Sequence, residues 1–152
     1  MIQANLFNQN IAEVQITYSN KVKASERTVI TSSTKAVEVL RNVFPSIELR
    51  EYFYILLLNR ANAVLGTYQV SAGGTTGTVA DPKIIFQAAL KANACSIILA
   101  HNHPSGSTIP SDADIKLTKE LKDGGIILDI NIYDHLIIAA DSYRSMADEG
   151  EI

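Results

Sequence analysis

The sequence predicts one α/β domain in which a mixed β-sheet is flanked by helices. The length of 152 residues suits one domain, and 47% of the residues are apolar, which is enough to build a buried core. Apolar runs typical of strands also interleave along the chain with segments that carry helix start and stop signals. We therefore expect strands and helices to pack around one sheet.

The N-terminal part of the chain is expected to form a lead-in to this domain. Residues 1–10 are polar and aperiodic, whereas residues 11–22 contain an alternation of apolar and polar residues that predicts a strand. On this basis residues 1–24 form a lead-in with a strand, and residues 25–152 form the main domain.

A helix and then a pair of strands should follow. Serine and threonine at positions 32–34 predict a cap for a helix over residues 36–41, which Pro45 ends. Residues 52–58 form a continuous aromatic and apolar run, typical of a central strand covered on both faces. After a short turn, residues 63–70 are expected to form the returning strand.

The middle of the chain predicts a loop, a helix and a further strand. The glycine-rich residues 72–78 indicate a flexible loop, because they lack the Gly-Lys-Ser/Thr ending of a phosphate-binding loop. Asp81 and Pro82 fit the cap and first position of a helix over residues 83–93. The apolar residues 95–100 then predict a buried strand.

The last part of the chain predicts a helix and two short strands. Ser111 is a good helix cap, and Gly124 with Gly125 indicates where that helix ends. Residues 126–131 and 136–139 are apolar enough to form two further strands of the sheet.

Charge and cysteine content narrow the class of protein. The net charge is -3, with 13 basic and 16 acidic residues, which gives no basic footprint for nucleic acid. The one cysteine forms no internal disulfide, and the N-terminus lacks the pattern of a signal peptide. No run approaches the roughly 18 apolar residues of a membrane span. We therefore expect a cytoplasmic protein without a membrane partner.

Two histidines and an aspartate predict a metal site. His101 and His103 lie two residues apart at the end of a predicted strand, so their side chains project to the same side. Asp114 falls in the first turn of the next predicted helix, from where its carboxylate could return to the histidines. Two imidazoles and one carboxylate are a typical ligand set for catalytic Zn²⁺.

Each of these residues also has a structural interpretation. The histidines could be polar residues at the rim of a sheet, and Asp114, three residues after Ser111, could be only the acidic partner of a capping box. Those interpretations leave unexplained why two of only three histidines lie beside a loop shaped by proline and glycine.

A hydrolytic zinc site also needs a group that carries a proton. Glu51 is a candidate because it precedes the strand over residues 52–58 and could stand at the end of the sheet. Spacing alone favours a solvated glutamate beside Arg50. His135, which follows Asp134, could support the metal site from behind or could equally be a structural histidine.

The stretch His-x-His, seven residues, Ser, two residues, Asp resembles the signature of the JAMM metalloproteases, also called JAB or MPN-plus domains. The sequence His-Asn-His-Pro-Ser-Gly that begins at residue 101, followed later by Asp134 and His135, is similar to that of the RadC branch of this family. The resemblance runs from about residue 25 to the C-terminus. The resemblance implies a cytidine-deaminase-like α/β/α fold.

The resemblance also implies a role for each candidate residue. His101, His103 and Asp114 match the zinc ligands. Ser111 matches the serine that helps to bind the water and the developing oxyanion, and Glu51 matches the upstream glutamate that acts as general acid and base.

Three classes of function follow. The first is a zinc-dependent JAMM-type metallohydrolase that cleaves a peptide or isopeptide bond in a protein or peptide substrate. The second is a non-enzymatic accessory or DNA-repair-associated metal-binding module. A nucleic-acid partner is suggested only by this family association. The helix-hairpin-helix region of longer RadC proteins has no counterpart in residues 1–24. The third, a nucleobase deaminase, needs a Cys-x-x-Cys motif, whereas this chain has one cysteine.

Overall fold

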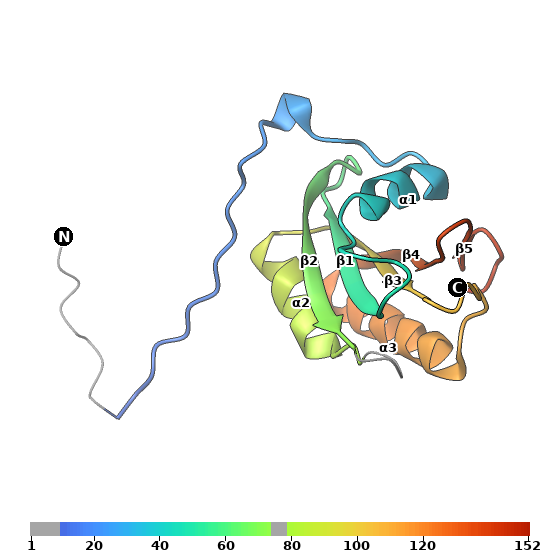
Figure 1. Cartoon of the computed structure of the whole chain (residues 1–152). Coiled ribbons are helices and arrows are strands. Elements are labelled where there is room, and N and C mark those ends of the chain that lie inside the picture. The colour runs from blue at the N-terminus through green and yellow to red at the C-terminus, as the bar shows by residue number, and fades with distance from the viewer. Residues whose placement is uncertain (1–9, 74–78) are drawn as a thin grey trace.

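A mixed sheet of five strands forms the middle of the molecule, and three α-helices flank it in the part of the chain that the computed structural model describes, residues 10–73 and 79–152 (Figure 1). The strands are β1 (Tyr52–Leu58), β2 (Val64–Ala72), β3 (Ser96–Asn102), β4 (Asn131–Ile138) and β5 (Tyr143–Ser145). The helices are α1 (Ser33–Arg41), α2 (Pro82–Lys91) and α3 (Asp112–Leu128), with a short 3₁₀ turn, η1, at Ala24–Glu26.

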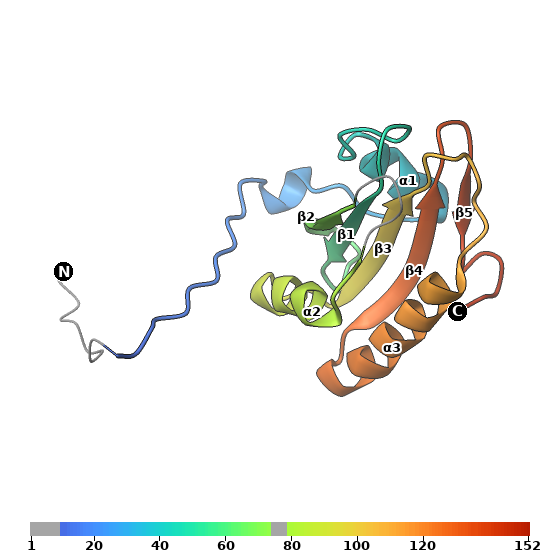
Figure 2. The same ribbon diagram turned by 60° about the horizontal axis from the view of Figure 1, so that its bottom comes forward.

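The strand order in the sheet is β2-β1-β3-β4-β5. β1 pairs antiparallel with both β2 and β3, β3 pairs parallel with β4, and β4 pairs antiparallel with β5. Helix α1 covers one face of the sheet, and α2 and α3 cover the other (Figure 2). The predicted α/β class is confirmed, and so is the three-layer α/β/α arrangement that the resemblance implied.

The central strand β1 supplies both halves of the core. Successive side chains of a strand point to opposite faces, and residues 53–58 are all buried. On one face Tyr54, Leu56 and Leu58 pack against α1, and on the other face Phe53, Ile55 and Leu57 pack against α2 and α3. The continuous apolar run therefore predicted this strand correctly, because a strand covered on both faces has no polar side.

Helices α1 and α2 begin where their caps predicted. The Ser32 hydroxyl accepts the N–H of Lys35 at 3.2 Å, and the Asp81 carboxylate accepts the N–H of Lys83 at 2.9 Å. Pro82 occupies the first turn of α2, where its missing N–H costs nothing. The predicted loop over residues 72–78 falls mostly on residues 74–78, which lie outside the described residues.

The strand predicted over residues 11–22 is wrong. Residues 11–22 are extended and exposed, and none of them belongs to a strand of the sheet. Their contact with the domain includes Tyr18, whose hydroxyl donates to the carbonyl of Leu65 at 2.6 Å. Alternation of apolar residues indicates an extended chain with an apolar side, but a strand also needs a partner for its backbone groups.

The predicted end of α3 is also wrong. The helix continues through Gly124 and Gly125 to Leu128, so the first of the two strands expected after it is helical instead. Ile126 and Ile127 are 79% and 85% exposed, and they lie on the solvent side of the last turn. The second predicted strand exists but begins earlier, at Asn131, and β5 was not predicted.

Gly125 is required for close packing of the chain behind α3. A Cβ at this position would lie 2.2 Å from the backbone oxygen of Ile130, where the chain turns back towards β4. We expect Gly125→Ala to lower the free energy of unfolding by about 1–3 kcal/mol, because backbone must move to admit the methyl group. Thermal and denaturant unfolding would measure the change.

Gly124→Ala is the matched control for that prediction. A Cβ at Gly124 would meet the ring of Phe86 at 3.0 Å, and a side chain can adjust more easily than a backbone carbonyl. Alanine also favours a helix over glycine by about 1 kcal/mol. Equal stability of the two variants would contradict the close approach at Gly125.

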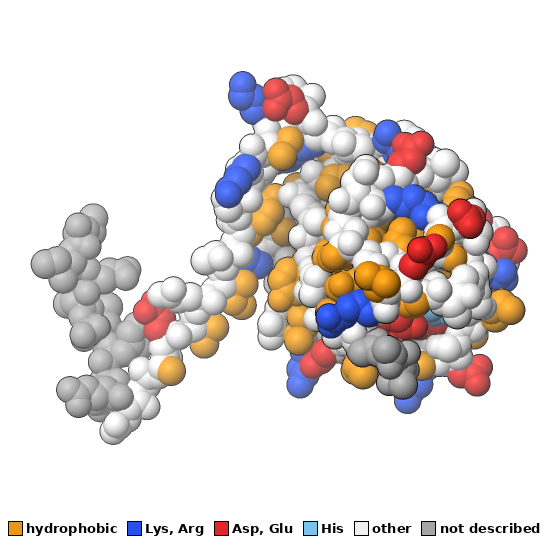
Figure 3. Space-filling model, in the orientation of Figure 1, with side chains coloured by type: hydrophobic (Ala, Val, Ile, Leu, Met, Phe, Trp, Pro, Cys, Tyr) orange, Lys and Arg blue, Asp and Glu red, His pale blue; other side chains and the backbone are white. Residues whose placement is uncertain are grey.

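The surface carries mixed charge. On the face shown in Figure 3, basic and acidic side chains are interspersed with apolar ones. Neither positive nor negative charge dominates a broad area of this face. Among the described residues, no helix combines the length and the apolar character needed to cross a membrane.

Candidate metal centre

The C-terminal end of β3 places the two histidines of the predicted site. His101 is 2% exposed and lies on the sheet face covered by α2 and α3, where its ring stacks on Phe53 of β1 with centroids 5.7 Å apart. Phe53 is the register partner of His101, so the neighbouring strand orients the imidazole. His103 follows two residues later, and its ring lies 4.7 Å from that of His101.

His101, His103 and Asp114, the metal triad, converge in the structure as predicted. The Nε2 atoms of the two histidines are 2.9 Å apart, and Asp114 Oδ2 lies 3.4 Å from His101 Nε2. One potential ligand atom from each of the three residues lies within 4.8 Å of the others. A tetrahedral ion with bonds of about 2.0 Å has ligand atoms about 3.3 Å apart. The metal triad therefore fits a Zn²⁺ ion.

A hydrogen bond fixes which nitrogen of His103 faces the metal triad. His103 Nδ1 lies 2.7 Å from the carbonyl oxygen of Ser107. A carbonyl only accepts, so Nδ1 donates and the neutral ring carries its lone pair on Nε2. The turn that brings Ser107 back to the histidine contains Gly106 at φ 87°, a conformation that favours glycine.

Asp114 completes a capping box with Ser111, and the same carboxylate faces the histidines. Its Oδ2 accepts the backbone N–H of Ser111 at 2.8 Å, and its own N–H donates to the Ser111 hydroxyl at 3.1 Å, which completes a capping box. The same Oδ2 faces His101. Burial alone would raise the pKa of this carboxyl, but the interactions with His101 and Ser111 outweigh it and lower the pKa. The helix cap thus presents an ionised carboxylate to the histidines.

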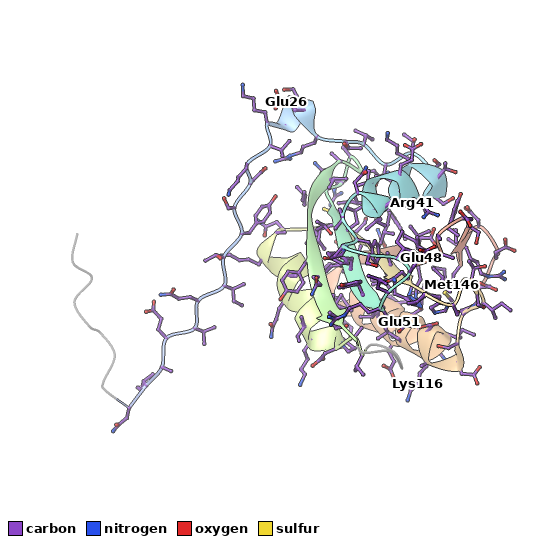
Figure 4. All side chains as sticks on the ribbon, in the orientation of Figure 1. Glu26, Arg41, Glu48, Glu51, Lys116 and Met146 are labelled. Carbon is purple, nitrogen blue, oxygen red and sulfur yellow. The ribbon has the colours of Figure 1, made fainter. Side chains whose placement is uncertain are left out.

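A cleft of about 430 Å³ opens beside the metal triad. Glu51 and Ser111 both line it together with the triad. β1 lies next to β3 and runs antiparallel to it, so Glu51, which precedes β1, stands at the same sheet end as His101, as expected. Figure 4 shows Glu51 at this end of β1, on the side towards α3.

Asn102 holds the segment that carries Glu51, a role that the sequence analysis did not identify. Its side chain points away from the histidines, to the other face of the sheet, and is fully buried. The amide oxygen accepts the N–H of Tyr52 at 2.7 Å, and the amide nitrogen donates to the carbonyls of Arg50 and Ile47 at 2.8 and 2.9 Å. Asn102 therefore fixes the backbone on both sides of Glu51.

The residues of the Asp134-His135 pair point to opposite sides of β4. His135 is fully buried behind His101, with its Nε2 2.8 Å from His101 Nδ1, and burial lowers its pKa. Asp134 instead accepts the Ser145 hydroxyl at 2.5 Å and the N–H of Ala147 at 3.0 Å, and burial raises its pKa. His135 therefore lies directly behind His101, whereas Asp134 anchors the C-terminal segment.

Comparison of the sequence with known proteins finds a matching family and several relatives. The model of the RadC-like JAB domain family matches residues 30–151. A UPF0758 protein of Flavobacterium johnsoniae is 43% identical over 80% of this chain and 52% of its own length. UPF0758 proteins of Salinibacter ruber and Thermosynechococcus vestitus are 36% and 37% identical over 84% and 83% of this chain, and 54% and 50% of their own lengths. The chain thus spans about half the length of these relatives.

Proposed function

Because this chain belongs to the RadC-like JAB domain family, we propose that it is a zinc-dependent metallohydrolase that cleaves a peptide or isopeptide bond. The observation that carries this proposal is the convergence of the metal triad beside a cleft that Glu51 and Ser111 also line. Catalytic zinc sites commonly have three protein ligands and one open position.

In this proposal the metal triad, Glu51 and Ser111 each have a separate role in hydrolysis. Zn²⁺ held by the metal triad would supply a Lewis acid that lowers the pKa of a water molecule to about 7. The Glu51 carboxylate would take the proton of that water and give it to the leaving amine. The Ser111 hydroxyl would donate a hydrogen bond to the substrate oxygen that gains negative charge.

Two observations favour this function over a module that keeps metal for structure or binds DNA. A structural zinc site usually has four protein ligands. Among residues 10–73 and 79–152, the converging group of histidine, cysteine and acidic side chains has three members, those of the metal triad. The mixed charge of the visible surface and the net charge of -3 give no footprint for a phosphate backbone. We therefore propose a protein or peptide as the substrate.

Zinc content is the direct test. We expect protein purified without chelators to contain about one Zn²⁺ per chain, because three converging donors make a typical catalytic site. Elemental analysis would measure this, with the His101→Ala, His103→Ala double variant as the control that should lose the ion. Trace zinc in the wild-type protein, with no uptake when zinc is added, would remove the basis of the proposed function.

A further inference from the structure

Strand β2 forms a long edge of the sheet, and the strand that pairs with it in residues 10–73 and 79–152 is β1. The other edge strand, β5, has three residues and carries Arg144, whereas β2 has nine residues, Val64–Ala72, with no charged residue and no proline. Short length, charge and proline are features by which edge strands avoid pairing with other chains. Because β2 lacks all three, its edge is suited to accept a further extended segment.

A second segment of the chain has the complementary character. Residues 11–22, which we call the N-terminal arm, are extended but pair with no strand in the described part of the chain. Val14, Ile16 and Tyr18 alternate with polar residues, so the arm has one apolar side. Val14 is 82% exposed and Ile16 is 47% exposed. Water therefore covers an apolar side that would be more stable against a partner.

The arm does not cover the edge of β2 in its own chain. It runs beside β2 and then leaves the domain (Figure 1), and the tip of the Tyr18 side chain reaches β2 by a hydrogen bond to the Leu65 carbonyl. The two backbones are therefore farther apart than the roughly 4.8 Å between paired strands. The Val64 N–H donates to the Thr28 carbonyl at 2.8 Å, but the turn η1 lies between this contact and the arm and interrupts the pairing.

We propose that the N-terminal arm pairs with the edge of β2 in a second copy of this chain, whose own arm pairs in return with β2 of the first copy. Each copy supplies one arm and one edge, so the exchange closes a two-fold dimer. A groove of about 240 Å³ remains open between the arm, β2 and α2, and its walls include Leu57, Ile84 and Ala88. The apolar side of the incoming arm would fill this groove while its backbone pairs with β2.

A second copy suits this surface better than an unrelated peptide. A foreign peptide added to β2 would cover the edge of the sheet but would leave the apolar side of the arm in water. Exchange between two copies covers both surfaces at once, and it depends neither on zinc nor on hydrolysis.

Substitution of the apolar side of the arm tests the exchange. We expect the wild-type protein to form a dimer, measured by size-exclusion chromatography with light scattering over a range of concentrations. In the Val14→Asp, Ile16→Asp double variant the dissociation constant of the dimer should rise by at least about 100-fold, because each arm would lose two buried apolar side chains. Its monomer should unfold at the temperature of a wild-type monomer, since both side chains are exposed in a single copy.

The Ile126→Asp, Ile127→Asp double variant is the matched control. Both isoleucines are exposed on the last turn of α3, and neither lines the groove between the arm, β2 and α2. The same number of apolar side chains is exchanged for the same charge, so this variant should dimerise like the wild-type protein.

Hydrogen exchange identifies the segments that form the interface. We expect the amides of residues 11–22, and those amides of β2 that do not pair with β1, to exchange slowly in the wild-type dimer and quickly in the Val14→Asp, Ile16→Asp variant. A wild-type protein that stays monomeric would overturn the proposal, and slow exchange in that monomer would show that the arm closes on its own β2. A dimer that persists in the arm variant would also overturn it, because another surface would then join the two copies.

Discussion

Glu51→Gln should leave a folded, zinc-loaded protein whose hydrolysis is slower by roughly 10²–10⁴-fold, the usual weight of general-base catalysis. Glutamine keeps the shape of glutamate but takes up no proton at neutral pH. Glu51 lines the cleft without belonging to the cluster of converging metal donors, so its loss should spare the metal. The measurements are zinc content and the kcat of cleavage of a fluorogenic peptide or isopeptide that the wild-type protein cleaves.

Glu48→Gln is the matched control. Glu48 lies three residues earlier in the same segment and is exposed, and it is not among the residues that line the cleft beside the metal triad (Figure 4). The same change of charge at Glu48 should leave cleavage unchanged. If Glu51→Gln retained more than about a tenth of the wild-type rate, where loss of a general base costs at least about 100-fold, Glu51 would have no part in the proton transfer.

The parts of the fold that sequence predicted well are those decided by local chemistry. The Ser32 and Asp81 caps act within a few residues, and the β1 run has no polar side, so neither needs knowledge of distant contacts. The metal triad belongs to this group as well. His101 and His103 share a side of one strand, and the turn that follows leaves Asp114 in the first turn of α3.

The features that the sequence predicted wrongly, or did not predict, depend on contacts between distant segments. Residues 11–22 have the alternation of a strand, but among the described residues they pair with no strand of the sheet. Pairing of the backbone depends on distant segments and not on the local pattern. Gly125 resembles a helix terminus, yet its conformation is helical and its role is to admit the carbonyl of Ile130. Asn102 acts on the segment of Glu51, which lies 51 residues away in the sequence, so only the folded chain reveals this role.

A substitution of Asp114 separates the proposed role of metal ligand from the role of helix cap, because one oxygen would serve in both. Oδ2 accepts the Ser111 N–H at 2.8 Å and lies 3.4 Å from His101 Nε2. In Asp114→Asn the amide oxygen can still accept from Ser111, so we expect stability to change by at most about 1 kcal/mol. The negative charge is lost, and with it an ionic ligand of zinc. Affinity for Zn²⁺ should fall by more than about 100-fold, beyond the roughly 10–100-fold loss that is usual when a hydrogen-bond partner of a metal ligand is removed.

Asp112→Asn controls for the charge that Asp114→Asn removes from the first turn of α3. Asp112 is the first residue of the helix and is exposed, so both variants weaken the favourable interaction with the helix dipole by about 0.3–1 kcal/mol. Zinc affinity from chelator competition and thermal unfolding of the metal-free proteins should be measured on both. We expect similar unfolding temperatures and a large difference in zinc affinity. Wild-type zinc affinity in Asp114→Asn would restrict Asp114 to its capping role, and the metal triad would lose its carboxylate.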